Sequence, residues 1–392
     1  RWIIPTGSII PANQYLVLRE GHYVGTTMQY SANEFGNTLK LNEYGDEVFL
    51  YSASGTTLTG YSNGMKLNGC LANTSYGEYT TSTGEKHIVP LTTTTLGTAN
   101  SGPKVGPLVI TKIYYNPLVI GGKPTGSEFV QIKNISTSTV NLYDEANPQN
   151  GWIVDGIGYT FTNQETLSAG DSMYIISNEM TIAEFRTRYS LPLSTNVFIF
   201  PNKLDNAGET IAIKSPLIPY TSGDTAYVIY ATVDDVTYGN LSPWPDANGN
   251  GKLLKRIKNN EYGNDVINWT ADNGKGLLPP TYNLTVNGGS GGGLVLQNSP
   301  ITVFASDAPT GKAFYYWQCS DIELLDNPYV EEISFTMPAN DVTLTAIYTN
   351  LTTGLIINYG DPWKYNNTGT DLGVAWREPE YNDTQWNTGN TT

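Results

Sequence analysis

Few residues in this chain have the types and spacing that catalysis or metal binding requires. The sequence contains two histidines, His22 and His87, and two cysteines, Cys70 and Cys319. The histidines lack the His-x-x-x-His spacing that directs two imidazoles to one metal ion, and a site built on them would need both, with added carboxylates. Two cysteines far apart do not make a disulfide framework, so we expect small buried hydrophobic residues there.

One stretch matches the first half of a calcium-binding loop. Asp246, Asn248 and Asn250 carry side-chain oxygens at alternate positions, and a glycine follows, as in the pattern D-x-[DN]-x-[DN]-G. The twelfth position should hold a bidentate carboxylate but holds Ile257. Two interpretations remain: a calcium site with these three ligands and a further oxygen from Glu261 or another segment, or an Asn/Gly-rich hairpin turn without metal.

Other patterns resemble catalytic motifs without the groups that would activate them. The run from Gly288 to Gly292 fits G-x-S-x-G, in which a strained strand-to-helix turn exposes the serine. A strand-like run follows instead of a helix, and no histidine lies nearby to act as a base. The neighbouring carboxylates Asp234–Asp235 and Glu331–Glu332 point to opposite faces of a strand. We therefore expect no active site and no enzyme activity in this chain.

The composition excludes several classes of protein. The chain has 392 residues, a formal net charge of −15 and 11% aromatic residues. Nucleic-acid-binding proteins normally carry basic excess. The basic cluster of Lys252, Lys255, Arg256 and Lys258 is too small to offset the negative charge. We interpret Lys252 and Lys258 as solvated strand edges. No apolar run approaches the ~18 residues of a membrane span. What remains is a globular, turn-rich, all-β chain.

Alternation of polar and apolar residues dominates the sequence and predicts half-buried strands. Residues 128–133 and 208–214 show it clearly, and similar runs recur about every ten residues between turn signals, a spacing typical of sandwiches. One short helix is expected after Thr181, because Thr181 and Glu184 form a capping box. Ile182, Phe185 and Tyr189 then fall on one helical face.

An internal repeat relates the first hundred residues to the segment that follows. Residues 9–18 align with 166–175, and residues 41–50 align with 204–213. The first copy lacks a counterpart of the opening part of the second, which starts near Gly106. We therefore expect Arg1 to lie inside a domain that is incomplete at its start and has an exposed sheet edge.

Residues 108–272 resemble a lamin tail domain of the bacterial extracellular type, and residues 1–100 resemble its latter two-thirds. The motifs that carry this resemblance are Leu108–Pro117, Glu128–Ile132, Leu204–Glu209, Val236–Gly239 and Ser242–Pro245. The resemblance implies an immunoglobulin-like β-sandwich, which agrees with the strand pattern.

Two further resemblances cover the rest of the chain. Residues 282–348 are similar to divergent internalin-type B repeats, and residues 363–389 resemble the start of a jelly-roll module. Their motifs are Tyr282–Gly289, Phe314–Trp317 and Phe335–Leu344, then Trp363–Tyr365, Gly373–Pro379 and Tyr381–Trp386. None of these families is catalytic in itself.

The sequence thus predicts four all-β parts. They are an incomplete lamin-tail-like sandwich at 1–100, a complete one at 106–276, a smaller B-repeat-like domain at 281–349 and a truncated jelly-roll start at 351–392. Tryptophans in these parts would suit stacking on sugars, but we expect a core role first for each, since large aromatic residues usually fill a sandwich core. The candidates are Trp152, Trp244, Trp317, Trp363, Trp376 and Trp386.

These observations predict a fragment of a secreted or cell-surface bacterial protein with a non-catalytic role in adhesion, ligand binding or spacing. Its partners would be glycans or surface proteins, without nucleic acid and without a membrane span in this part. The alternative is an accessory region of a larger extracellular enzyme. The resemblance points there to a spore-coat-type kinase or a metallophosphoesterase, with its catalytic domain outside this fragment.

Overall fold

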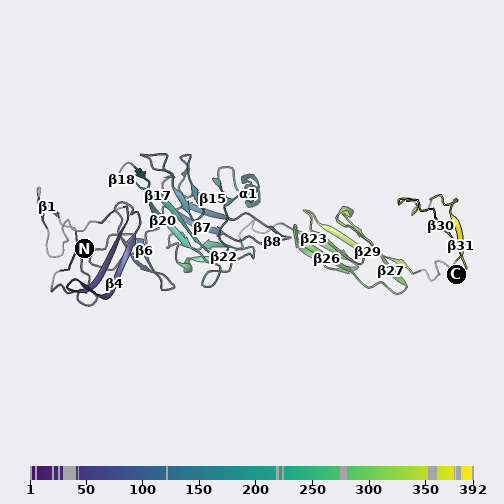
Figure 1. Ribbon diagram of the computed structural model, residues 1–392, viewed down its shortest axis with the longest axis horizontal. Coiled ribbons are helices and arrows are strands. Elements are labelled where there is room, and N and C mark those ends of the chain that lie inside the picture. Colours follow the sequence, from purple (N-terminus) through teal and green to yellow (C-terminus); the bar gives the residue numbers. More distant parts are fainter. Residues whose placement is uncertain are drawn as a thin grey trace. The chain divides into compact units, whose positions relative to one another are not determined.

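The computed structural model describes residues 2–4, 7–19, 22–24, 27–29, 41–42, 44–120, 122–217, 220–222, 225–273, 280–351, 360–374, 376 and 381–390. The chain divides into two compact units, Arg1–Pro280 and Thr281–Thr392 (Figure 1). Strands make up nearly all the regular structure, and they pack as sheets around separate cores, which confirms the predicted all-β sandwich class. Within the described ranges, no helix has the length and apolar character needed to cross a bilayer.

Two sheets form the sandwich of the second repeat. One sheet has six strands in the order β16-β15-β10-β7-β21-β22, and the other has four in the order β13-β12-β17-β20. All neighbours are antiparallel except β15 and β16. Their bounds are β7 Leu108–Tyr114, β10 Phe129–Asn134, β12 Ile153–Asp155, β13 Tyr159–Thr160, β15 Ser172–Ser177, β16 Val197–Phe200, β17 Thr210–Pro216, β20 Tyr230–Thr237, β21 Leu253–Arg256 and β22 Trp269–Asp272.

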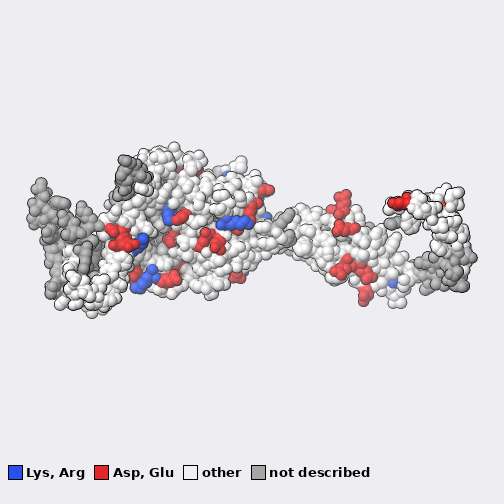
Figure 2. Space-filling view, in the orientation of Figure 1, with Lys and Arg blue, Asp and Glu red and all other residues white. Residues whose placement is uncertain are grey.

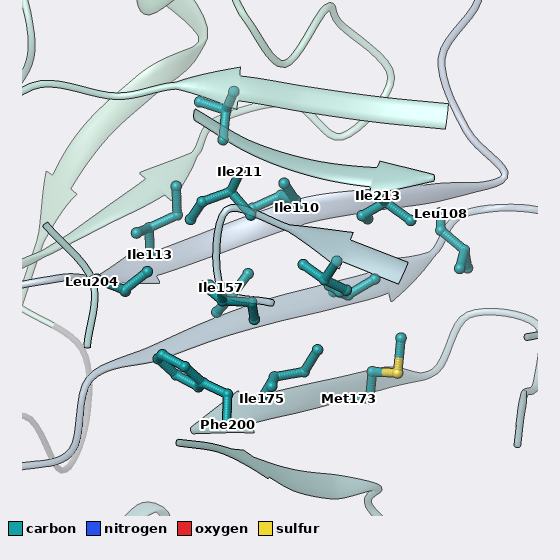
Figure 3. Packing of buried hydrophobic residues seen from close by; sticks show 14 of the residues in the cluster. Leu108, Ile110, Ile113, Ile157, Met173, Ile175, Phe200, Leu204, Ile211 and Ile213 are labelled. Carbon is teal, nitrogen blue, oxygen red and sulfur yellow. The ribbon is translucent and has the colours of Figure 1, made fainter. Parts of the chain in front are cut away.

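Apolar side chains from both sheets meet between them, as Figure 3 shows. Ile110 and Ile113 of β7 face Ile211 and Ile213 of β17, and all four are fully buried. The other face of the six-stranded sheet is covered by α1, Ile182–Tyr189, whose Phe185 ring lies 5.5 Å from that of Phe129. Because both faces are covered, β7 is apolar almost throughout instead of alternating.

The predicted helix and its cap are confirmed. The backbone N–H of Glu184 donates to Thr181 Oγ1 over 3.2 Å, and the N–H of Thr181 donates to Glu184 Oε2 over 2.8 Å. The remaining elements of the second repeat are short. They are β8 Val119–Ile120, β9 Lys123–Pro124, β11 Val140–Asn141, β14 Thr166–Leu167, β18 Tyr220–Ser222, β19 Thr225–Tyr227 and the 3₁₀ helix η1 Val266–Asn268.

The described parts of the first repeat are three antiparallel hairpins. They are β1 His22–Val24 with β2 Thr27–Gln29, β3 Asp46–Ser54 with β4 Thr57–Leu67, and β5 Tyr76–Thr80 with β6 Lys86–Pro90. Among the described residues up to 100, Val89 and Leu91 are the buried hydrophobic ones. This segment therefore shows strands without a sandwich core of its own.

The second unit has a separate core around Trp317, which is fully buried. Its sheets have the orders β25-β23-β29-β27 and β24-β26-β28. The elements are β23 Thr281–Asn287, β24 Gly289–Ser290, β25 Gly293–Leu296, β26 Pro300–Ala305, β27 Lys312–Cys319, η2 Ile322–Leu324, β28 Glu332–Thr336 and β29 Val342–Asn350, followed by the hairpin of β30 Pro362–Tyr365 and β31 Asn387–Asn390. Ser290 lies on β24, paired with Phe304 of β26, so it does not stand on a strand-to-helix turn.

A buried ion pair joins the two sheets of the sandwich. Arg256 of β21 donates to Asp234 of β20 through Nη1 to Oδ2 at 2.7 Å and Nη2 to Oδ1 at 3.2 Å, and both side chains are almost fully buried. The pair also binds the backbone of β7, because Ile110 N–H donates to Asp234 Oδ2 and Arg256 Nη1 donates to Ile110 O. Arg256 thus lies in the interior of the sandwich, apart from the exposed Lys255 and Lys258 of the same basic cluster. Its guanidinium donates a hydrogen bond to the backbone of β7 past the last residue of β7 that pairs with β21.

We expect Arg256→Ala to destabilise the sandwich by about 3–5 kcal/mol, because it leaves the Asp234 carboxylate buried without its counter-charge. Hydrogen exchange at the amides of β7 and β20 measures this loss within the sandwich. The matched control is Lys255→Ala, which removes the exposed pair with Asp272 and should cost less than about 1 kcal/mol. Equal losses in the two variants would contradict the assignment.

Candidate functional site

A hollow of about 690 Å³ lies where the first repeat meets the four-stranded sheet of the sandwich. We call it the junction hollow. From the first repeat it is lined by the ends of β3 and β4, and from the sandwich by β12, β17 and β20. The lining residues are Tyr44, Gly45, Asp46, Glu47, Lys66, Leu67, Asn68, Gly69, Ile153, Lys214, Ile229, Tyr230 and Thr232.

A close backbone approach positions the two walls of the hollow. Gly69 forms a parallel bridge with Ala231 at the start of β20. A Cβ at Gly69 would lie 2.7 Å from the carbonyl oxygen of Tyr230, so any larger residue would push the first repeat off the sheet. The bridge holds the β3–β4 hairpin beside β20 and leaves the hollow between them.

The walls of the hollow carry both charges together with apolar surface. Lys66 and Glu47 form an exposed ion pair at 3.0 Å. Lys214 binds Asp155, and this hydrogen bond lowers the pKa of the Asp155 carboxyl below its usual value. Tyr230 is half-buried, and burial raises the pKa of its hydroxyl. The hollow therefore offers donors and acceptors beside an aromatic ring.

The charged side chains on this unit are mixed in sign. Figure 2 shows blue and red side chains interspersed over the visible face of residues 1–280. On the face shown of the second unit, acidic side chains prevail. A mixed surface gives no strong single-sign field for steering a highly charged ligand. The hollow is thus suited to a polar ligand of low net charge.

A second cluster, which we call the hairpin clasp, joins β5–β6 to the sandwich. Asp265 is 2% exposed and accepts hydrogen bonds from the backbone N–H of Ser82, at 2.9 Å, and from the Ser82 hydroxyl. Tyr79 OH reaches the same carboxylate at 3.4 Å. His87 Nδ1 lies 3.2 Å from Tyr262 OH, and the Tyr79 and Tyr262 rings meet edge to face at 5.5 Å.

Asp235 lies behind the clasp and is nearly as buried as its neighbour in sequence. Asn264 Nδ2 donates to Asp235 Oδ2 at 2.8 Å. Burial, reinforced by the charge of Asp234, raises the pKa of Asp235 to about 6, while His87 and Arg256 act in the opposite direction. The two carboxylates do not converge on one site, since Asp234 binds Arg256 and Asp235 binds Asn264.

The candidate calcium ligands lie together in one turn after β20. Asn248 Oδ1 accepts from Asn116 Nδ2 at 2.6 Å, and Asn250 Oδ1 accepts from the N–H of Lys252 at 3.2 Å. Asn250 Nδ2 in turn donates to the carbonyl of Asp246 at 3.2 Å. These bonds favour the interpretation as a hairpin turn held by its own amides, and the calcium site stays a prediction.

The other candidate residues are dispersed. Cys70 and Cys319 are both free and half-buried, and burial raises the pKa of each thiol. Within the described ranges, no three His, Cys, Asp or Glu side chains gather as a metal site would need.

The tryptophans divide into buried and exposed ones. Trp152, Trp269 and Trp317 are core residues, whereas Trp363 and Trp376 are each 45% exposed. Sequence reasoning missed three tyrosines of the second unit. Tyr315, Tyr316 and Tyr329 have ring centroids 5.2–6.3 Å apart, and Tyr315 and Tyr329 are exposed. The two adjacent tyrosines in β27 were the sequence feature that could have indicated this aromatic cluster.

Comparison with known proteins identifies one part of the chain. Residues 281–351 match the family model of the divergent InlB B-repeat domain. This confirms the resemblance of residues 282–348, and the segment is called the B-repeat-like domain below. InlB B-repeat domains are typical of extracellular proteins.

One solved structure also aligns with the chain. It is the crystal structure of a DUF4876 family protein from Bacteroides thetaiotaomicron, with 13% sequence identity and a TM-score of 0.25, covering 56% of this chain and 85% of that one. A likeness this weak carries no argument. No curated protein matches the chain. The lamin tail and jelly-roll resemblances stay predictions.

The raised pKa of Asp235 predicts a pH-dependent stability of the sandwich. Because its folded pKa lies above the ordinary value, the folded state binds the extra proton, and this contribution to stability is lost as pH rises from about 4 to beyond 6. Asp235→Asn keeps an acceptor for Asn264 and does not ionise. The variant should match the parent near pH 4 and exceed its free energy of unfolding at pH 7 by about 2–3 kcal/mol.

Urea unfolding at the two pH values checks this difference. The control is Asp171→Asn, which changes an exposed carboxylate away from the clasp and should give no comparable gain at pH 7. An Asp235→Asn variant whose advantage does not grow with pH would contradict the prediction.

Proposed function

We propose that this chain is a non-catalytic segment of a secreted or cell-surface bacterial protein, acting in adhesion, ligand binding or spacing. The observation that carries the proposal is the match of residues 281–351 to the divergent InlB B-repeat domain. The all-β units, with separate cores around β7–β17 and around Trp317, support it further. Independent cores are what a string of modules needs.

We infer that residues 1–100 and 106–276 are two lamin-tail-like domains and that 351–392 begins a jelly-roll-like module. The β3–β4 hairpin supports the repeat, because it pairs Glu47 with Lys66 at the aligned place where β17 pairs Thr210 with Thr237. The domain at 281–349 is the B-repeat-like one. In this arrangement the first two domains share the junction hollow.

A neutral glycan is the ligand that the junction hollow fits best. Sugars present C–H faces, which pack on aromatic and aliphatic side chains, and hydroxyls, which donate to carboxylates and accept from ammonium groups. Tyr230 and Ile153 supply apolar surface, while Glu47, Lys66 and Lys214 supply the polar partners. The mixed charge favours such a ligand over nucleic acid or a strongly charged polymer.

We expect the purified chain to bind bacterial cell-wall glycans and Tyr230→Ala to weaken that binding about tenfold, the equivalent of about 1.4 kcal/mol. Glycan-array binding followed by titration calorimetry measures it. Lys66→Ala, at the exposed rim, should weaken binding less.

The matched control is Tyr315→Ala, an exposed tyrosine of the B-repeat-like domain, which should bind as the parent does. Weakened binding in Tyr315→Ala with unchanged binding in Tyr230→Ala would assign the ligand to the B-repeat-like domain and overturn the role of the hollow. Circular dichroism of each variant verifies that its fold is intact.

A further inference from the structure

Three tyrosines of the B-repeat-like domain gather beside β27, at one edge of its four-stranded sheet. They are Tyr315 and Tyr316 of β27 and Tyr329 in the loop before β28, and we call them the tyrosine cluster. Their ring centroids lie 5.2–6.3 Å apart, and Tyr315 and Tyr329 are 53% and 64% exposed. The three rings belong neither to the core around Trp317 nor to the junction hollow.

A bulge in β27 directs two neighbouring side chains to the outside. Phe314 and Tyr316 are paired with adjacent residues of β29, so Tyr315 is an extra residue between them. Neighbouring side chains of a regular strand point to opposite faces, whereas a bulge sets two residues opposite one. Phe314 and Trp317, on either side of the bulge, pack into the core. Tyr315 and Tyr316 therefore both lie outside the core, with their rings 5.2 Å apart.

Backbone hydrogen bonds hold the third ring beside the other two. The Trp317 N–H donates to the carbonyl of Pro328 over 2.8 Å, and the Tyr329 N–H donates to Asn327 Oδ1 over 3.0 Å. These bonds fix the loop against β27, so the place of Tyr329 does not depend on ring contacts alone. The three ring planes are inclined to one another by 50–82°. The rings therefore face different directions, as the walls of a corner do.

The charge of this domain is one-sided. Residues 281–350 contain seven acidic residues and one lysine, Lys312, which gives a net charge of −6. Among the described residues, none of these seven carboxylates forms an ion pair. Asp326 and Glu331 flank Tyr329 in the chain, and acidic side chains prevail on the face of the domain that Figure 2 shows. Such a surface attracts a cation to the tyrosine cluster.

We propose that the tyrosine cluster binds a quaternary ammonium group of the kind that choline carries. A cation within about 6 Å of a ring centroid is attracted by the negative face of the ring, and inclined rings attract it from more than one side. A quaternary ammonium has no N–H group to leave unpaired against a ring. A primary ammonium carries three donors, which require oxygen acceptors that ring faces do not supply.

Other ligands fit the tyrosine cluster less well. A neutral sugar would gain contact with the rings but nothing from the acidic surroundings. A phosphate group would meet charge of its own sign. A metal ion would need several oxygen ligands at one point, and within the part of the chain that the structure describes no three acidic side chains gather in this way.

Titration of the 392-residue chain with choline, followed by saturation-transfer NMR of the trimethylammonium protons, tests the proposal. The matched ligand is the neutral analogue of choline in which carbon replaces the nitrogen, because it has the same shape without the charge. We expect saturable binding of choline and binding of the neutral analogue that is weaker by at least about tenfold. Phosphocholine should bind more weakly than choline, and this comparison separates the free cation from a phosphorylated polymer as the source of the group.

Variants separate the ring face from its apolar area. Tyr329→Phe keeps the face and should bind choline as the parent does. Tyr329→Leu keeps apolar area without the face and should weaken binding about two- to fivefold. The matched control is Phe304→Ala, which removes an exposed ring from the other sheet of the domain and should leave choline binding unchanged. Unchanged hydrogen exchange in β29 shows that the domain stays folded in each variant.

Three results would overturn the proposal. They are equal binding of choline and its neutral analogue, tighter binding of phosphocholine than of choline, and full binding by Tyr329→Leu. Absence of choline binding to the parent chain would overturn it as well. Binding of a neutral glycan at the junction hollow is a separate measurement on another part of the chain, so the two proposals can fail independently.

Discussion

The buried pair of Arg256 and Asp234 is the interaction on which the first unit depends. Where β7 has no strand partner, its backbone N–H and C=O bond to this pair instead. The same carboxylate and guanidinium link the two sheets. Arg256 Nη2 also donates to the carbonyl of Glu261 over 2.5 Å. That bond anchors the loop whose Tyr262 and Asp265 hold the β5–β6 hairpin. The placement of the first repeat thus follows from a contact inside the second.

The two segments that the sequence repeat relates differ in how they obtain a core. In the second, β7 is covered on one face by β17 and on the other by α1, so its alternation disappears. In the first, the same kind of hairpin keeps aliphatic side chains in contact with solvent. Burial of apolar area is the main favourable term in folding, and the first repeat therefore relies on docking through the Gly69 bridge and the hairpin clasp to hold its place.

The sequence predicted the features that depend on local patterns. Alternation located β10 and β17, the capping box of Thr181 and Glu184 located α1, and the motifs of the B-repeat-like domain were sufficient to recognise it. Local patterns do not show contacts between distant segments, so the bond between Ser82 and Asp265 and the junction hollow were not foreseen. The burial of Arg256 was not foreseen either, because its partner Asp234 stands on another sheet.

The topology of the B-repeat-like domain has a mechanical consequence. Its first strand, β23, and its last, β29, are adjacent and parallel, with Leu284 opposite Val342 and Asn287 opposite Thr345. Tension applied to the chain on either side of the domain pulls these two strands past each other along their length. The hydrogen bonds between them are then loaded in shear and share the force, whereas strands peeled apart from one end break their bonds in turn. The pairing of β23 and β29 therefore resists such a pull more than a strand pair loaded at one end would.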